Sequence, residues 1–321
     1  MSWKKNLTIT TILAGTTAIG IHLINKAIYV SATLDNLLSH TPENYYEWKF
    51  GKIFYRKAGN GKPILLIHDL SSYSSSYEWS YMIDELSKTR TVYALDLLGC
   101  GRSDKPALTY TNFLYVQMIT DFIKNVIKSK TDVIVTGESS SFILGSCQND
   151  HDIIDRIIMI NPSDIQTSAH IPNSKTKILT KLIQLPLIGT LLYNILTQRK
   201  TIENLFCTEY FYDKNNISER DTKVYYEAAH IGNAESKNLF ASISGRYLTS
   251  NIKLYLENLN NSIFIITGSK EKYLETASKY KDILPSIEIT SIDKTSYLPQ
   301  LEDPSGILEQ INIYLDDPTE E

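Results

Sequence analysis

In this 321-residue chain, the strongest candidate for a catalytic residue is a serine at a predicted strand-to-helix turn. The apolar run 132–136 leads into G-E-S-S-S at 137–141, and an apolar helical pattern starts at Phe142. Small residues let a strand and a helix crowd together at such a turn, and the strain lifts the central hydroxyl above the sheet. The segment approximates G-x-S-x-G, with Ser141 in place of the second glycine, and predicts Ser139 as a nucleophile.

A nucleophilic serine needs a base, and the sequence offers few. The chain has six histidines, and none of them follows His230. His230 ends a helical pattern at 225–230 that could overhang the serine, so it is a candidate substitute base. A packed or exposed histidine without a chemical role is the alternative.

The pattern of the remaining segments predicts how this turn is held. A hairpin is expected at 45–56, and short apolar runs then alternate with helical stretches. Such continuous runs are typical of strands buried on both faces of a parallel sheet. From 165 to 245 only helical patterns occur, and the alternation then resumes. We therefore expect an α/β core at 45–164 and 246–317, interrupted by an all-helical cap at 165–245. The strands are expected at 63–67, 91–95, 132–136, 157–160, 262–267 and 287–291.

Three further segments sharpen this picture. I-H-D-L stands at 67–70, D-L-L-G-C-G-R-S-D at 96–104, and L-P-Q-L-E-D-P at 298–304. With the serine turn, they make residues 45–317 resemble the α/β-hydrolase family, in its capped branch of esterases, lipases, dehalogenases and epoxide hydrolases. The resemblance implies a mostly parallel hydrolase sheet flanked by helices, with the cap as an insertion. It implies no metal and no organic cofactor.

The resemblance also implies roles for single residues. Ser139 matches the nucleophile, and the backbone N–H groups of Leu70 and Ser140 match the oxyanion hole, which stabilises a tetrahedral intermediate. Glu271 matches the acid of the triad, and a solvated glutamate between two lysines is the alternative. Asp164 is a second candidate acid that some relatives use.

Two positions depart from the family pattern. Asp69 stands where a glycine is usual, so a carboxylate enters the oxyanion loop. Tyr297 stands where the catalytic histidine is expected. Imidazole titrates near 6.5 and phenol near 10, which makes a tyrosine a poor base at neutral pH.

These observations leave two main hypotheses and a weaker third. The chain is a serine hydrolase, an esterase acting on an ester or another lipophilic acyl substrate. Alternatively it is a pseudo-enzyme whose hydrolase pocket binds a ligand or whose cap binds a partner protein. In the third hypothesis, Ser139 is only a ligand contact for chemistry without a serine–histidine relay.

Residues 1–35 differ from the rest and form a predicted anchor segment. After Lys4 and Lys5, residues 6–25 carry no charged side chain except His22. Twenty helical residues span about 30 Å, the thickness of a bilayer core. We expect a single-pass membrane anchor through 6–25, with the domain on the extracytoplasmic side because the lysines precede it. A cleaved secretory signal and a helix packed on the domain are the alternatives.

Composition excludes one class of partner. The formal net charge is −4 and no basic cluster is present, so nucleic acid is not an expected partner. The cap holds very apolar stretches at 178–188 and 191–196. These could line an acyl pocket, touch a membrane, or pack against the domain.

Overall fold

The computed structural model describes residues 2–39 and 43–315, and their side chains from Gly15 onward. Within that part, one eight-stranded sheet has the order β1-β2-β4-β3-β5-β6-β7-β8. β1 pairs with β2 and β2 with β4 in antiparallel fashion, and the other pairs are parallel. The strands are β1 (Asn44–Trp48), β2 (Gly51–Ala58), β3 (Lys62–Ile67), β4 (Arg90–Leu95), β5 (Thr131–Thr136), β6 (Ile154–Ile160), β7 (Ser262–Gly268) and β8 (Glu288–Ile292).

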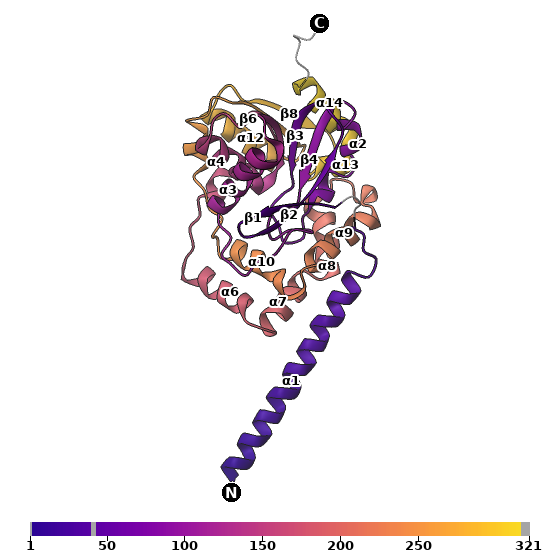
Figure 1. The fold of residues 1–321 in the computed structure, drawn as a ribbon, viewed down its shortest axis with the longest axis vertical. Coiled ribbons are helices and arrows are strands. Elements are labelled where there is room, and N and C mark those ends of the chain that lie inside the picture. The colour runs from indigo at the N-terminus through magenta and orange to yellow at the C-terminus, as the bar shows by residue number, and fades with distance from the viewer. Residues whose placement is uncertain (1, 40–42, 316–321) are drawn as a thin grey trace.

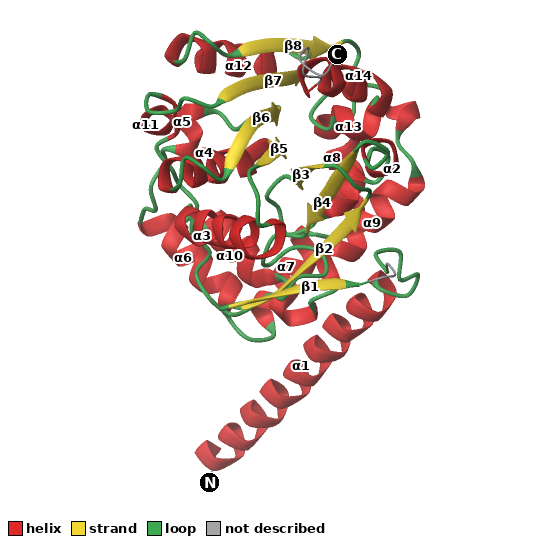
Figure 2. Cartoon of the chain, turned by 45° about the horizontal axis from the view of Figure 1, so that its top comes forward, coloured by secondary structure: helices red, strands yellow, loops and turns green. Residues whose placement is uncertain are grey.

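Both faces of the sheet are covered by helices (Figure 2). Alternate residues of each central strand enter two separate cores, as Leu65 and Leu66 of β3 do. Burial on both faces explains why the strands read as unbroken apolar runs. One face carries α3 (Asn112–Phe122), α4 (Ser140–Asn149), α11 (Ile252–Leu256) and α12 (Glu271–Ile283). The other carries α2 (Ile83–Leu86) and α14 (Pro304–Leu315), the latter preceded by α13 (Pro299–Glu302).

Between β6 and β7 the chain forms only helices, and those of residues 174–244 gather below the sheet in Figure 1. Their aromatic core, with Phe206 and Tyr225 at its centre, rests on Tyr77 and Leu298 of the α/β core. After α5 (Ile165–Ser168), this helical layer consists of α6 (Ser174–Gln184), α7 (Ile188–Leu196), α8 (Arg199–Leu205), α9 (Glu219–His230) and α10 (Lys237–Ser244), and α11 leads back to the sheet.

Helix α1 (Ser2–Ala32) projects away from the body in Figures 1 and 2. Its C-terminal part is fixed to α7 through Asn25, whose amide donates to the Leu187 carbonyl oxygen at 3.1 Å and accepts from Asn194 at 3.0 Å. No single helix of the described residues has both the length and the hydropathy of a membrane span. The membrane-anchor character predicted for this helix is therefore not supported by that criterion, since threonines dilute the apolar run 6–25. One bent pair, Ser174–Gln184 with Ile188–Tyr210, meets the criterion jointly, across a bend of 107°.

A buried ion pair shapes the loop after β4. The Arg102 guanidinium contacts the fully buried Asp96 carboxylate at 3.1 Å, and the backbone N–H groups of Arg102 and Ser76 also donate to it. Burial by itself raises the pKa of Asp96, but the Arg102 charge and these hydrogen bonds lower it to about 2. Within the 96–104 motif, Arg102 thus stabilises the buried carboxylate of Asp96 by its charge and its backbone N–H group.

We expect Arg102→Ala to lower the free energy of unfolding by about 3–5 kcal/mol, because it leaves Asp96 buried and unpaired. Lys88→Ala is the matched control, since it removes an exposed ion pair with Glu85 and should change stability by less than about 0.5 kcal/mol. Urea denaturation followed by circular dichroism measures both. Equal effects of the two variants would contradict the role given to Asp96.

Candidate functional site

The site lies where loops from three strands meet, at the carboxyl ends of β3, β5 and β8. Gly137 directly follows β5 and has φ +58°, a left-handed conformation that favours glycine. A Cβ at this position would collide with the Tyr297 hydroxyl and the Asp69 carboxylate. The sharp turn therefore falls at a residue without a side chain, and Tyr297 and Asp69 fill the space in front of it.

The Asp69 carboxylate is the centre of the site. It accepts a hydrogen bond from the backbone N–H of Glu138 at 3.0 Å, and further ones from the Leu70 N–H and the Tyr297 hydroxyl. Burial raises the pKa of Asp69 to about 6, against the opposing effect of these donors. A pair of backbone donors on these two loops is what stabilises an oxyanion in acyl transfer. Here that pair binds a carboxylate of the protein itself.

Tyr297 is held firmly against Asp69. Its ring stacks on Tyr210 of the cap at 5.6 Å between centroids, and its carbonyl oxygen accepts from the Asn161 amide at 2.9 Å. Burial, followed by the nearby charge of Asp69, raises the pKa of Tyr297 far above the usual value for a phenol. Tyr297 therefore stays protonated and serves as a donor to Asp69.

Ser139 has a different environment from the one its motif predicts. Its φ of −67° and ψ of −16° are helical, and the residue is completely buried. Its hydroxyl donates to the His68 carbonyl oxygen at 2.7 Å. Ser140, the predicted second oxyanion donor, is the first residue of α4 and is also completely buried. The donor next to Asp69 is the N–H of Glu138 instead.

The other predicted residues do not join this cluster. Among the described residues, no hydrogen bond links Ser139 to Glu271, which opens α12 with an exposed side chain, or to His230. His230 is buried in the cap, where its ring contacts the Tyr226 carbonyl oxygen at 2.8 Å, and burial lowers its pKa. Asp164 pairs with Lys279 at 2.9 Å and caps α5. Of the residues predicted for the oxyanion hole and the triad, Leu70 and Tyr297 donate hydrogen bonds to the Asp69 carboxylate.

Two acidic residues of the site, Glu78 and Glu138, were not predicted from the sequence to have a role in it. Glu78 is fully buried behind Asp69 and accepts from the Asp69 N–H at 3.2 Å and from the Gln300 amide at 2.8 Å. Burial, and then the Asp69 charge, raises the pKa of Glu78 to about 8. Glu138 follows Gly137 and borders two pockets. Surrounding protein and the charges of Asp69 and Asp164 raise the pKa of Glu138 to about 7, although its side chain is accessible from those pockets.

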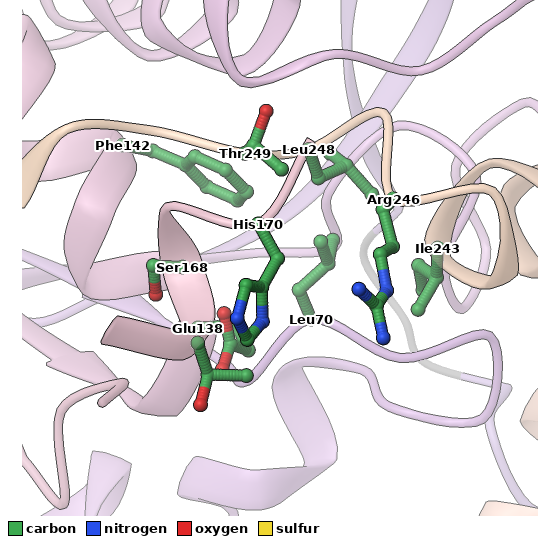
Figure 3. Close-up of a pocket in the computed structure, with 10 residues that line it drawn as sticks. Leu70, Glu138, Phe142, Ser168, His170, Ile243, Arg246, Leu248 and Thr249 are labelled. Atoms are coloured by element: carbon green, nitrogen blue, oxygen red, sulfur yellow. The ribbon is translucent and has the colours of Figure 1, made fainter. Parts of the chain in front are cut away.

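A largely apolar pocket of about 270 Å³ opens between core and cap on one side of Glu138 (Figure 3). Phe142, Leu70, Ile243 and Leu248 contribute its apolar wall. His170 and Arg246 add polar groups, and the Arg246 guanidinium extends into the pocket. No carboxylate of the described residues forms an ion pair with Arg246.

A second pocket, of about 520 Å³, lies on the other side of Glu138 and is lined by Asp69, Tyr297 and Lys272. Glu138 therefore lies between a largely apolar pocket and one whose wall mixes polar and apolar groups. No cluster of three potential metal ligands occurs among the described side chains.

Known proteins resemble this chain in sequence and in fold. A model described as "Alpha/beta hydrolase family" matches residues 64–305. The 2-hydroxy-6-oxo-6-(2'-aminophenyl)hexa-2,4-dienoic acid hydrolase of Metapseudomonas resinovorans is 25% identical over 118 residues, 36% of this chain and 41% of that protein. The match thus spans about two fifths of that relative.

Two solved structures show the same fold. An epoxide hydrolase, CorEH, superposes with a TM-score of 0.68 at 19% identity, covering 85% of this chain and 97% of its own. A bacterial membrane phospholipase A has a TM-score of 0.68 at 16% identity and covers 98% of both chains.

The acidic cluster predicts how stability depends on pH. Asp69, Glu78 and Glu138 have folded pKa values of about 6, 8 and 7, all above their ordinary values of 3.8 or 4.5. At these three sites the native protein therefore binds more protons than the unfolded chain from about pH 4 to about pH 8, and their contribution to stability falls as the pH rises through that range.

Glu78→Gln removes one of these titrations, so its melting temperature should fall less than that of the wild type between about pH 5 and about pH 8.5. Glu85→Gln, which changes an exposed side chain of α2, is the control and should keep the wild-type slope. Thermal unfolding at a series of pH values measures both slopes. An unchanged slope in Glu78→Gln would show that Glu78 is not a buried, protonated acid.

Proposed function

Because the chain belongs to the α/β-hydrolase family, we propose that it uses the family fold to bind a small acyl compound and does not hydrolyse it through a serine nucleophile. The observation that carries this proposal is the Asp69 carboxylate on the two backbone donors, in front of a glycine turn.

Three requirements of acyl transfer are unmet in this arrangement. The turn residue Gly137 has no side chain to attack a carbonyl carbon, and Ser139 uses its hydroxyl inside the protein. Tyr297, protonated and bound to Asp69, does not take a proton at neutral pH. The charge of Asp69 opposes the negative oxygen that the backbone donors would otherwise stabilise. Loss of one triad member alone leaves only about 10³–10⁴-fold acceleration.

The apolar pocket has the features of a binding site for an acyl compound with an acidic group. Phe142, Ile243 and Leu248 can cover an apolar body, and the unpaired guanidinium of Arg246 can form two hydrogen bonds with a carboxylate. Glu138 lines the same pocket, and its raised pKa of about 7 lets its carboxyl donate to that group in the protonated form. The volume of about 270 Å³ suits a small ligand.

One observation favours a second candidate, hydrolysis by an activated water. Asp69 has a pKa of about 6, close to the value that suits a general base at neutral pH, and two of the relatives are named as hydrolases. The Asp69 carboxylate would take a proton from water as the water oxygen attacks the acyl carbon. The leaving group would then recover that proton from Asp69.

A fluorophosphonate probe distinguishes hydrolysis by a serine nucleophile from ligand binding and from hydrolysis by an activated water. We expect no labelling of the wild type between about pH 6 and about pH 9, and p-nitrophenyl ester hydrolysis no faster than in Ser139→Ala. Labelling that disappears in Ser139→Ala would overturn the proposal. Hydrolysis that survives Ser139→Ala but is lost in Asp69→Asn would establish the activated-water mechanism instead.

We also propose that α1 anchors the protein in a membrane through residues 6–25, as a single pass with the domain on the extracytoplasmic side. Two apolar surfaces at the same end of the molecule support this proposal (Figure 1). On α1, Ile19, Leu23 and Ile24 are more than half exposed. Beside it, the cap exposes an apolar face made of Ile178, Leu179, Leu182, Leu185, Ile188, Ile195 and Leu196. Exposed apolar surface of this extent is typical of a partner or membrane contact.

The anchor predicts flotation of the full chain with neutral phosphatidylcholine vesicles. The double change Ile19→Asp and Leu23→Asp should abolish flotation, because each aspartate costs about 3 kcal/mol inside a bilayer. Ile313→Asp is the control, since Ile313 is 65% exposed on α14, at the opposite end of the molecule. The anchor is refuted if the double variant floats like the wild type or if the wild type stays in solution.

A further inference from the structure

A pocket of about 670 Å³ lies at the junction of α1 and the cap, away from the Asp69 cluster. Its wall combines His22, Asn25 and Lys26 of α1 with residues that precede and begin α7 and α10. The uncharged run 6–25 ends at this point. If α1 lies in a membrane as proposed above, the pocket stands at the level of the lipid headgroups.

Lys237 supplies a buried cation to this pocket. The residue is only 7% exposed, and its ammonium donates to the Leu185 carbonyl oxygen at 2.7 Å and to the Thr190 hydroxyl at 3.1 Å. An ammonium has three donors, so one remains for a ligand. No acidic side chain of the described residues pairs with Lys237, and burial lowers its pKa. A buried charge without a counter-ion is unfavourable, and an anion in the pocket would offset that cost.

Lys26 brings a second positive charge from α1 to the same pocket. The pocket is lined by one acidic side chain, Glu235, against these two lysines, so its charge is positive. Tyr29, Pro186 and Leu187 form an apolar part of the wall. Leu23 of α1 and Ile188 of α7 are exposed apolar residues that adjoin the lining residues His22 and Leu187 in sequence.

We propose that this pocket binds the phosphate-bearing headgroup of an anionic phospholipid. Lys237 and Lys26 contact the phosphate, and the acyl chains run along Leu23 and Ile188 toward the bilayer. Basic pockets beside membrane helices suit such headgroups because charge-assisted hydrogen bonds form next to apolar surface. A lipid is preferred over free phosphate because of the apolar wall. The proposal rests on the anchoring of α1.

The test uses the full chain in neutral detergent, titrated with short-chain phosphatidylglycerol or phosphatidylcholine while thermal unfolding is followed. A ligand of the folded state raises the melting temperature with its concentration. We expect phosphatidylglycerol to do so and phosphatidylcholine to have little effect. Lys26→Gln and Lys237→Gln should each weaken the phosphatidylglycerol response by about tenfold in apparent affinity.

Lys181→Gln is the matched control, because Lys181 is an exposed lysine of α6 outside the pocket. Lys26→Gln keeps the test decisive if Lys237→Gln fails to fold. An equal response to both lipids, or an equal loss in Lys181→Gln, overturns the proposal. So does an equal, Lys237-dependent response to inorganic phosphate, which would assign the pocket to a free phosphate.

Vesicle flotation separates this proposal from the anchor. A chain that floats with neutral vesicles but responds equally to both lipids keeps its anchor and loses the headgroup site. A chain that does not float, yet shows the Lys26-dependent preference for phosphatidylglycerol, loses the anchor and keeps the site.

Discussion

The Asp69 carboxylate connects three loops that are distant in sequence. It accepts from the loop after β3 through Leu70, from the turn after β5 through Glu138, and from the loop after β8 through Tyr297. A buried carboxylate is stable only when several donors surround it, so each loop must keep its position. Behind it, Glu78 and Gln300 extend the network to η1 (Ser76–Trp79) and α13. The positions of these loops are therefore coupled, because each supplies a hydrogen-bond donor to the buried Asp69 carboxylate.

This constraint also reaches the cap. Tyr297 donates to Asp69 on one side and stacks on Tyr210 on the other, so its side chain joins the cap to the acidic cluster. On the far side of the cap, Asn25 ties α7 to α1. The cap therefore links the acidic cluster at one end with the α1 junction at the other.

The sequence predicted the fold well because a parallel sheet buried on both faces leaves continuous apolar runs. The predicted runs at 132–136 and 262–267 coincide with β5 and β7, and the family was recognised from short motifs beside such strands. The unusual residues Asp69 and Tyr297 were also visible, because both stand at fixed distances from those motifs.

The exact position of the turn was not visible. Gly137 and the serines at 139–141 are all small, so either Gly137 or Ser139 could have occupied the strained turn between β5 and α4. In the structure Gly137 has the left-handed backbone angles, and Ser139 has helical ones. Glu78 could not be predicted either, because its contact with Asp69 depends on how η1 packs behind β3. The role of Ser139 as a nucleophile stays a prediction. The sequence could not predict these features because backbone angles and long-range contacts do not follow from the spacing of residues within a motif.

Gly137 also restricts the order in which substitutions can be accepted. Any side chain there would overlap the Tyr297 hydroxyl and the Asp69 carboxylate, so a serine introduced alone meets an occupied space. Positions 69 and 297 must become smaller or reorient before position 137 can gain a nucleophile. A serine introduced at position 137 alone therefore displaces the Asp69 and Tyr297 side chains and breaks the hydrogen bonds that hold them.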